Sequence, residues 1–142
     1  FREVQDLLFA VIDKGNRDKL SEFNIYSIKQ ICDYLDIDTK FVDSSSLDYK
    51  RGLDAQGKLI DITRLLNGEI YINPIGGREL YSKEEFLKFS LKIFFLKINE
   101  FVYPQGKGDF VPNLSIIDVL MWNSKEDVKS MLNNYTLLEG TE

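Results

Sequence analysis

The sequence predicts an α/β fold, a layered sandwich in which a mostly parallel sheet of at least three strands is flanked by helices. After the first two helices, helical patterns alternate with short strand patterns, and 44% of the 142 residues are apolar, enough to bury a core. We therefore expect residues 1–142 to form a single α/β domain. Three strands are few for a sheet covered on both faces, so we expect a missing N-terminal part or a partner to complete it.

The N-terminal part of the chain predicts two amphipathic helices and a short strand. Apolar residues recur at helical spacing from Val4 to Ile12, and Gly15-Asn16 would end this first helix. The second helix begins at about Asn24. Thr39 to Val42 reads as a strand, which leads into the polar cluster Asp43 to Ser46.

The middle of the chain predicts a third helix, two strands and the start of a fourth helix. The third helix covers Asp54 to Leu66, and Asn67-Gly68 makes a suitable C-terminal stop. Glu69 to Asn73 is the next strand. Ser82 to Glu85 is a capping box that begins a helix. Leu91 to Ile98 has strand propensity on both faces, as expected for a strand buried on two sides.

The C-terminal part predicts a long irregular segment and two helices. Asn99 to Asn113 contains several Gly and Pro residues, and loops of this length in a domain are usually functional or disordered. Ser115 to Asp118 and Ser124 to Asp127 are capping boxes that begin the two closing helices.

The composition excludes several classes of function. A net charge of −5 argues against nucleic-acid binding, which normally needs a basic face. The single cysteine, Cys32, excludes an internal disulfide. Because the chain contains no histidine, it has no Ser-His triad, no zinc-binding HExxH motif and no imidazole base. Acid–base chemistry would therefore use Asp, Glu, Lys, Tyr or a bound water. No residue is assigned to a metal, and the sequence leaves the cofactor open.

The sequence has no signal peptide and no apolar run long enough to cross a bilayer, so we expect a cytoplasmic protein without a membrane span. The chain begins at Phe1, without an initiator Met and already inside a helical pattern. We therefore expect a fragment or a trimmed product.

The most informative segment is Tyr71 to Tyr81, where a strand pattern leads through Pro and two glycines into a helix start. Such a junction leaves backbone amides available for an anionic or polar ligand. Gly76 and Gly77 permit close approach of that ligand, and Arg78 could pair with a phosphate or carboxylate. Asn73 and Tyr81 could donate hydrogen bonds to it. The alternative is a tight connection in which the glycines only turn the chain, since the glycine spacing of neither the P-loop nor the dinucleotide fold is present.

Two further polar segments are candidates for the same site. Ser44, Ser45 and Ser46 follow a predicted strand and would lie at the carboxyl edge of a parallel sheet, where they could hold a phosphate or a sugar hydroxyl. The alternative is an ordinary polar turn. In the segment from Tyr103 to Asp118, Asp109 and Asp118 are the best carboxylates for acid–base or hydrogen-bonding roles, although Asp118 has a competing role in a helix cap. An aromatic platform for a sugar ring around Tyr103 and Trp122 has no support from spacing.

Several motifs, in order, resemble the WbqC-like protein family. The motifs are Tyr71–Tyr81, Lys83–Phe86 and Phe110–Asn123, with Ser44–Leu47 and the helix before Asn67-Gly68 in the expected order. The resemblance spans about Leu20 to Leu138. It implies a role in bacterial clusters for O-antigen and other surface polysaccharides, as a transferase that modifies an activated amino sugar by acyl or aminoacyl transfer. Family members usually carry a further N-terminal segment that has no counterpart here, so the resemblance also implies an incomplete enzyme.

The resulting hypothesis assigns a small-molecule substrate, a sugar nucleotide or an activated acyl donor. Tyr81 and Asp109 are the candidate catalytic residues. The candidate substrate-binding residues are Ser44, Ser45, Ser46, Asn73, Gly76, Gly77, Arg78 and Asn113. The competing interpretation is a non-catalytic subunit that binds a sugar nucleotide or a partner enzyme of the same pathway. The sequence does not decide whether the protein forms a homo-oligomer.

Overall fold

The computed structural model describes residues 1–140. The chain divides into two compact units, which are treated separately below. Unit 1 consists of Phe1–Lys40 and Glu100–Asn133, and unit 2 consists of Phe41–Asn99 and the stretch from Asn134 onwards. That the whole chain behaves as one domain stays a prediction.

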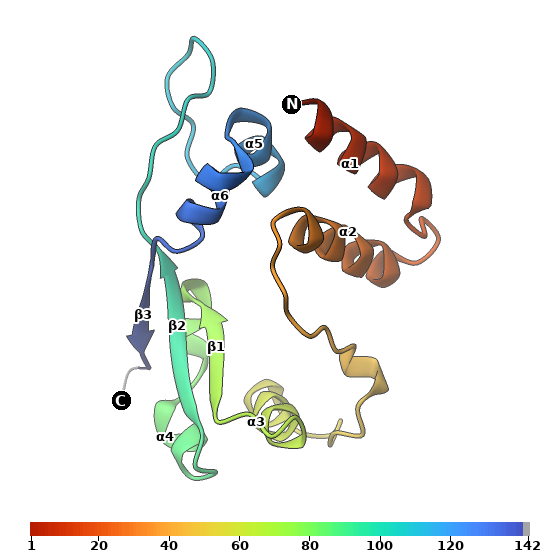
Figure 1. Ribbon diagram of the computed structural model, residues 1–142. Coiled ribbons are helices and arrows are strands. Elements are labelled where there is room, and N and C mark those ends of the chain that lie inside the picture. The colour runs from red at the N-terminus through yellow and green to blue at the C-terminus, as the bar shows by residue number, and fades with distance from the viewer. Residues whose placement is uncertain (141–142) are drawn as a thin grey trace. The chain divides into compact units, whose positions relative to one another are not determined.

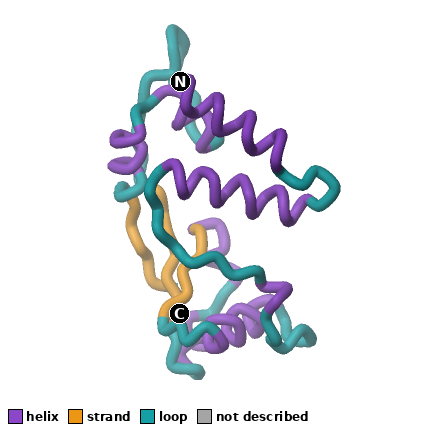
Figure 2. Tube along the Cα trace, turned by 45° about the vertical axis from the view of Figure 1, so that its right-hand side comes forward, coloured by secondary structure: helices purple, strands orange, loops and turns teal. Residues whose placement is uncertain are grey.

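Unit 1 is helical and contains α1 (Arg2–Lys14), α2 (Leu20–Tyr34), α5 (Ile116–Trp122) and α6 (Lys125–Met131). Figure 1 shows these helices, and Figure 2 shows α1 and α2 running antiparallel beside each other. All four were predicted, but α2 begins four residues before the predicted start at Asn24. Its first turn is held by Glu22, which accepts hydrogen bonds from Lys19 Nζ and Asn16 Nδ2, both at 2.8 Å.

The core of unit 1 joins all four helices to the loop before α5. Its buried members are Val4, Leu35, Tyr103, Val119, Leu120 and Val128. Both predicted C-terminal helix starts are confirmed: Ser115 Oγ accepts from the Ile117 amide, and Ser124 Oγ accepts from the Asp127 amide. These contacts fix the first turns of α5 and α6.

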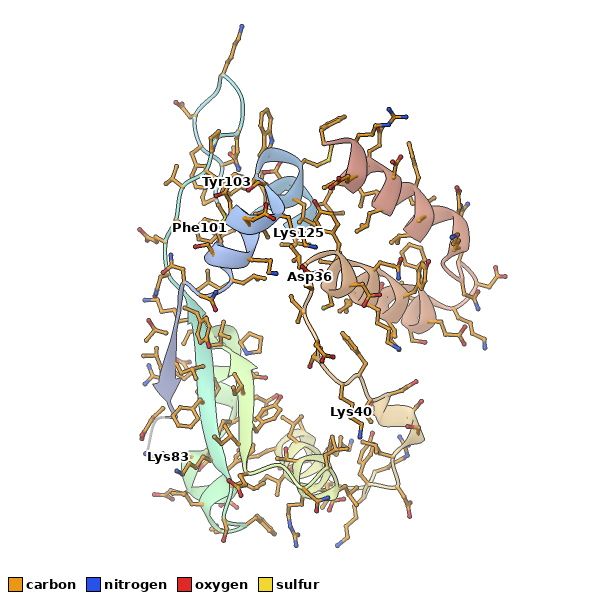
Figure 3. All side chains as sticks on the ribbon, viewed as in Figure 1. Asp36, Lys40, Lys83, Phe101, Tyr103 and Lys125 are labelled. Atoms are coloured by element: carbon orange, nitrogen blue, oxygen red, sulfur yellow. The ribbon has the colours of Figure 1, made fainter. Side chains whose placement is uncertain are left out.

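Asp36, just after α2, connects that helix to α6. Its Oδ2 atom lies 2.8 Å from Lys125 Nζ and 3.2 Å from Lys129 Nζ. The Lys125 ammonium also lies 5.6 Å from the centre of the Tyr34 ring. Figure 3 shows the Asp36 and Lys125 side chains next to each other. Hydrogen bonds from these two lysines hold the pKa of the Asp36 carboxyl below its ordinary value of 3.8.

This lowered pKa predicts an acid-sensitive contribution of Asp36 to stability. Because the folded-state pKa is depressed, the contribution is present above pH 3.8 and is lost as the pH falls towards the folded-state value. Asp36→Asn should therefore lower the free energy of unfolding near neutral pH and flatten its decline in acid. Asn suits the positive φ of 54° at this position. The check is urea unfolding from pH 7 to 3, with Asp6→Asn on α1 as the control; identical acid profiles for wild type and Asp36→Asn would refute the assignment.

Unit 2 is built on a three-stranded sheet in the order β1-β2-β3. Its elements are η1 (Ser44–Ser46), α3 (Ala55–Leu65), β1 (Ile70–Pro74), η2 (Ile75–Leu80), α4 (Lys83–Leu87), β2 (Lys92–Ile98) and β3 (Tyr135–Glu139), where η marks a short 3-10 helix. β1 and β2 are parallel, with Tyr71 opposite Ile93, and β3 is antiparallel to β2, with Leu138 opposite Phe95 (Figure 1). Helices combined with this sheet confirm the α/β class, and the sheet is mixed.

The sheet corrects two sequence predictions. The predicted strand Thr39–Val42 is not a strand; the segment is extended and irregular, and Phe41 and Val42 are partly exposed. Strand propensity alone gives no sheet without a neighbouring strand to accept the backbone hydrogen bonds. The third strand is instead β3, which the sequence analysis did not find. The C-terminal end of α3 is as predicted, with the Gly68 amide donating to the Thr63 carbonyl at 2.8 Å.

The register gives the sheet one buried face and one exposed face. The buried face carries Tyr71, Ile93 and Phe95, which pack with Phe86 of α4 and Ile60 of α3. The opposite face carries Lys92 and Glu139 at one end, and its exposed apolar side chains are Ile70, Ile72, Ile98, Tyr135 and Leu137. β2 is thus fully buried on only one side, although it was predicted to be buried on both.

Candidate functional site

The connection from β1 to β2 holds the candidate binding loop, here called the glycine turn (Gly76, Gly77 and Arg78). Pro74 ends β1, and the chain enters η2 directly. At the far end, Ser82 caps α4 by accepting from the Glu85 amide, as its capping box predicted. The Ser82 amide itself donates to Gln56 Oε1 of α3 at 2.6 Å. The glycine turn is therefore fixed at both ends by unit 2.

Gly77 is buried because the Asn73 side chain occupies the space beside it. A Cβ atom built on Gly77 would lie 2.1 Å from Asn73 Nδ2 and 3.3 Å from Tyr81 Cε2. The Asn73 amide is held in place, since its Oδ1 accepts from Tyr71 Oη and its Nδ2 donates to the Pro74 carbonyl, both at 3.0 Å. Glycine at 77 is therefore required by close packing against β1. This supports the alternative interpretation for Gly77, in which the residue serves the turn itself.

Gly76 differs from its neighbour. No atom lies within 4 Å of a Cβ built on Gly76, so this side of the glycine turn is open. The backbone at Gly76 can therefore be approached from outside, which is the property that the sequence analysis assigned to both glycines.

Arg78 carries an unsatisfied donor. Its Nε atom is buried, and among residues 1–140 it has no hydrogen-bond acceptor. A guanidinium is always charged and carries five N–H donors in one plane, a geometry that matches carboxylate and phosphate oxygens. Leaving a buried donor unpaired costs about 1–3 kcal/mol, and more for a charged group. The arrangement at Arg78 is thus suited to an anionic oxygen.

Two tyrosines flank the glycine turn. Tyr71 stacks on Phe86 with ring centres 5.8 Å apart, and burial, with a smaller contribution from nearby Tyr81, raises the pKa of its phenol. Tyr71 therefore stays protonated at neutral pH and keeps donating to Asn73. Tyr81 is half-buried and packs against the same core cluster, next to Gly77. This position is compatible with the hypothesis that the Tyr81 hydroxyl contacts a ligand, which stays a prediction.

The three serines form η1 and make a turn of their own. Asp43 Oδ1 accepts from the Ser45 amide at 2.8 Å, which lowers the pKa of the Asp43 carboxyl, and Ser46 Oγ donates to the Asp43 carbonyl at 2.7 Å. Arg51 Nη2 donates to the Ser45 carbonyl at 3.1 Å, and the Arg51 guanidinium lies over the Tyr49 ring. Arg51 was not among the predicted site residues, although it binds this segment from six residues away. The strand expected before the serines is absent, so that reason for placing them at a sheet edge no longer holds.

Asp109 and Asn113 belong to unit 1, whereas the other candidate residues belong to unit 2. Both are exposed in the loop between β2 and α5, and Asn113 has a positive φ of 60°. The loop is closed by Gln105, whose side-chain amide exchanges two hydrogen bonds with the backbone of Val111. That all candidate residues contribute to one site stays a prediction.

Asp118 has a role that the sequence could not show. Tyr103 Oη donates to Asp118 Oδ2 at 2.8 Å, and Gln105 Nε2 donates to the same atom at 3.2 Å. Burial raises the pKa of Tyr103, and the hydrogen bond to Asp118 adds to this, so the phenol remains a donor. The Tyr103 ring packs edge to face against the Phe110 ring, with ring centres 5.3 Å apart. The carboxylate thus faces the loop instead of completing the predicted capping box.

Two general properties can be stated for residues 1–140. No helix there is both long and apolar enough for a membrane span. No group of three or more His, Cys, Asp or Glu side chains in this part of the chain is arranged to hold a metal ion.

Residues 1–130 match the family model of the WbqC-like protein family. The match covers all the candidate residues, which lie between Ser44 and Asn113. No curated protein and no solved structure gave a match.

Proposed function

The chain belongs to the WbqC-like protein family, and from this premise we propose that it acts in bacterial surface-polysaccharide biosynthesis as a transferase that modifies an activated amino sugar. In this proposal the glycine turn binds the anionic part of the activated substrate. The cytoplasm, where activated sugars are made, is the proposed location.

One observation carries the binding role. The Arg78 Nε atom is buried without an acceptor among residues 1–140, and it lies two residues after Gly76, whose outer side is open. A phosphate or carboxylate oxygen at this position would accept from the guanidinium and approach the Gly76 backbone. Hydrogen bonds between charged groups contribute about 1.5–3 kcal/mol each, so this contact can dominate the affinity. Acid–base roles for Tyr81 and Asp109 belong to the same proposal.

The second candidate function is a non-catalytic subunit that binds a sugar nucleotide or a partner enzyme. It is favoured by the absence of histidine and of a defined nucleophile from the sequence. Both candidate functions need the anion site, so a binding experiment tests the feature that they share. An assay of transferase activity distinguishes the enzyme from the non-catalytic subunit.

Arg78→Ala should weaken the binding of pyrophosphate by about 10–100-fold, because a charge-assisted contact of 1.5–3 kcal/mol is lost and each 1.4 kcal/mol is tenfold. Arg78→Lys keeps a positive charge but loses the planar pair of donors, so its affinity for pyrophosphate should lie between that of the wild type and that of Arg78→Ala. The measurement is isothermal titration calorimetry with pyrophosphate. Arg64→Ala removes an exposed arginine from the same unit and is the matched control.

The outcome is interpretable because Arg78 Nε makes no protein hydrogen bond, so we expect the melting temperature of Arg78→Ala to stay near that of the wild type. Equal pyrophosphate affinity in Arg78→Ala and Arg64→Ala would refute the anion site.

The pathway role is tested in the native gene cluster. The gene is deleted and the mass of the polysaccharide repeat is measured by mass spectrometry. We expect a substituent to be missing from the repeat, and its identity would identify the group that the protein transfers. Complementation with Asp109→Asn or Arg78→Ala should fail to restore it, whereas Arg64→Ala should restore it. If the repeat were unchanged after deletion, the proposed function would be overturned. If complementation with Asp109→Asn restored the wild-type mass of the repeat, Asp109 would not belong to the site.

A further inference from the structure

Unit 1 carries a shallow cavity of about 600 Å³ that is widely open to solvent and that the glycine turn does not use. Its walls are mainly the apolar side chains of Leu114, Ile117 and Met121, with Phe1 and Trp122 around them and Asp118 as the only charged residue. All of these residues lie in unit 1. Cavities of 300–1,000 Å³ with apolar walls and few polar groups are typical small-molecule sites.

Asp118 lines this cavity, and its carboxylate is oriented by hydrogen bonds from the loop before α5. Its Oδ2 atom accepts from both Tyr103 and Gln105. Its Oδ1 atom accepts no hydrogen bond from any side chain or backbone group that the structure describes. Because Tyr103 is buried in the core of unit 1, the carboxylate is held on a rigid support. One charged acceptor is therefore held at a defined position among apolar side chains.

The indole of Trp122 provides a flat apolar wall. Its side chain is 48% exposed, although Trp usually buries most of its large surface. The ring is supported by the loop before α5: a Cβ on Gly106, which has a φ of +87°, would lie only 3.3 Å from Trp122 Cη2. A side chain at position 106 would therefore crowd the ring. The loop lies beside one edge of the indole, and about half of the residue remains accessible.

We propose that this cavity binds the pyranose ring of an amino sugar, with the apolar C–H face of the ring against the Trp122 indole and a hydroxyl or amino group donating to Asp118. The proposal rests on the proposed function for the class of sugar, and it adds a place for the ring itself. An ammonium group would gain further from the negative face of the indole.

A nucleobase fits this cavity less well. Uracil flanks its N–H with two carbonyl oxygens, which would repel the Asp118 carboxylate. Guanine offers two adjacent donors and needs both carboxylate oxygens, but Oδ2 is already engaged by Tyr103 and Gln105. A hydroxyl or amino group on a sugar ring has neither problem, because it can turn to a single acceptor.

The test uses the fact that Trp122 is the only tryptophan of the chain. Its fluorescence therefore reports this cavity alone. Titration with the methyl glycoside of glucosamine should change the emission in a saturable way. Asp118→Asn, which keeps the acceptor for Tyr103 but removes the charge, should weaken the binding about tenfold or more. Glu126→Gln removes one exposed negative charge from the same unit and should bind as the wild type does.

A second measurement does not depend on the fluorescent reporter. Saturation-transfer NMR should show protein contact for the ring C–H protons of the glycoside, and Trp122→Ala should abolish it. The proposal would be overturned if neither measurement gave a saturable signal at glycoside concentrations well above the millimolar range. An Asp118-dependent response to uridine monophosphate alone would also overturn it, by making the cavity a base site. Pyrophosphate binding through Arg78 is measured separately, so failure here leaves that result unaffected.

Discussion

Phe86→Ala is expected to lower the free energy of unfolding by about 3–5 kcal/mol, the range found when a fully buried Phe is cut to Ala. Phe86 has no exposed surface, stacks on Tyr71 and lies at the centre of the cluster with Ile60, Ile93 and Phe95. Removing its ring leaves a cavity and withdraws the support of Tyr71. Urea unfolding followed by far-UV circular dichroism measures the loss.

Leu87→Ala is the matched control, because Leu87 is the next residue of α4 and is 51% exposed. It should cost no more than about 0.5 kcal/mol. A cost for Phe86→Ala as small as for Leu87→Ala would show that α4 does not pack on the sheet as described.

The same variant tests whether the chain is one domain. Trp122 lies in unit 1 and Phe86 in unit 2, whereas circular dichroism follows both units. If the chain unfolds as one cooperative domain, as the sequence predicts, the fluorescence and dichroism transitions of Phe86→Ala shift together. A fluorescence transition that stays at the wild-type midpoint would mean that the units unfold separately, and the single-domain prediction would be wrong.

Gly77→Ala should lower the free energy of unfolding by about 1–3 kcal/mol, because its Cβ would lie 2.1 Å from Asn73 Nδ2. To make room, Asn73 must give up its hydrogen bonds to Tyr71 and Pro74. Gly76→Ala is the adjacent control: nothing lies within 4 Å of its Cβ, so its stability should stay within about 0.5 kcal/mol of the wild type.

A double-mutant cycle separates this clash from other effects. Asn73→Ala alone leaves the Tyr71 hydroxyl without its acceptor, which should cost about 1–3 kcal/mol. In Gly77→Ala combined with Asn73→Ala, the clash is gone, so the double variant should be more stable than the sum of the two costs implies. Strict additivity would show that the Gly77 cost does not come from Asn73.

The sequence predicted the local parts of this structure and missed the non-local ones. Helix starts such as Ser82 and Ser124 were found because a cap and its amide partner lie three residues apart. The strand predicted at Thr39–Val42 failed because strand-forming residues there have no neighbouring strand. β3 was missed for the converse reason: its partner β2 lies some forty residues earlier in the chain.

The candidate site shows the same division. The position of the glycine turn could be predicted, since a strand, Pro, two glycines and a helix cap follow one another in the chain. That Gly77 packs against Asn73 while Gly76 is open could not, because both glycines read alike in sequence. The link from Tyr103 to Asp118 spans fifteen residues, and no spacing rule connects an irregular segment to a helix.

The contact between Asn73 and Gly77 also constrains how the sequence can diverge. A relative with a side chain at position 77 has no room for an amide at position 73, so the two positions should change together. Position 71 should follow, since a phenylalanine there no longer needs the Asn73 acceptor. Position 76, only one residue away, is free of this packing constraint, so a change there should not be coupled to the other three.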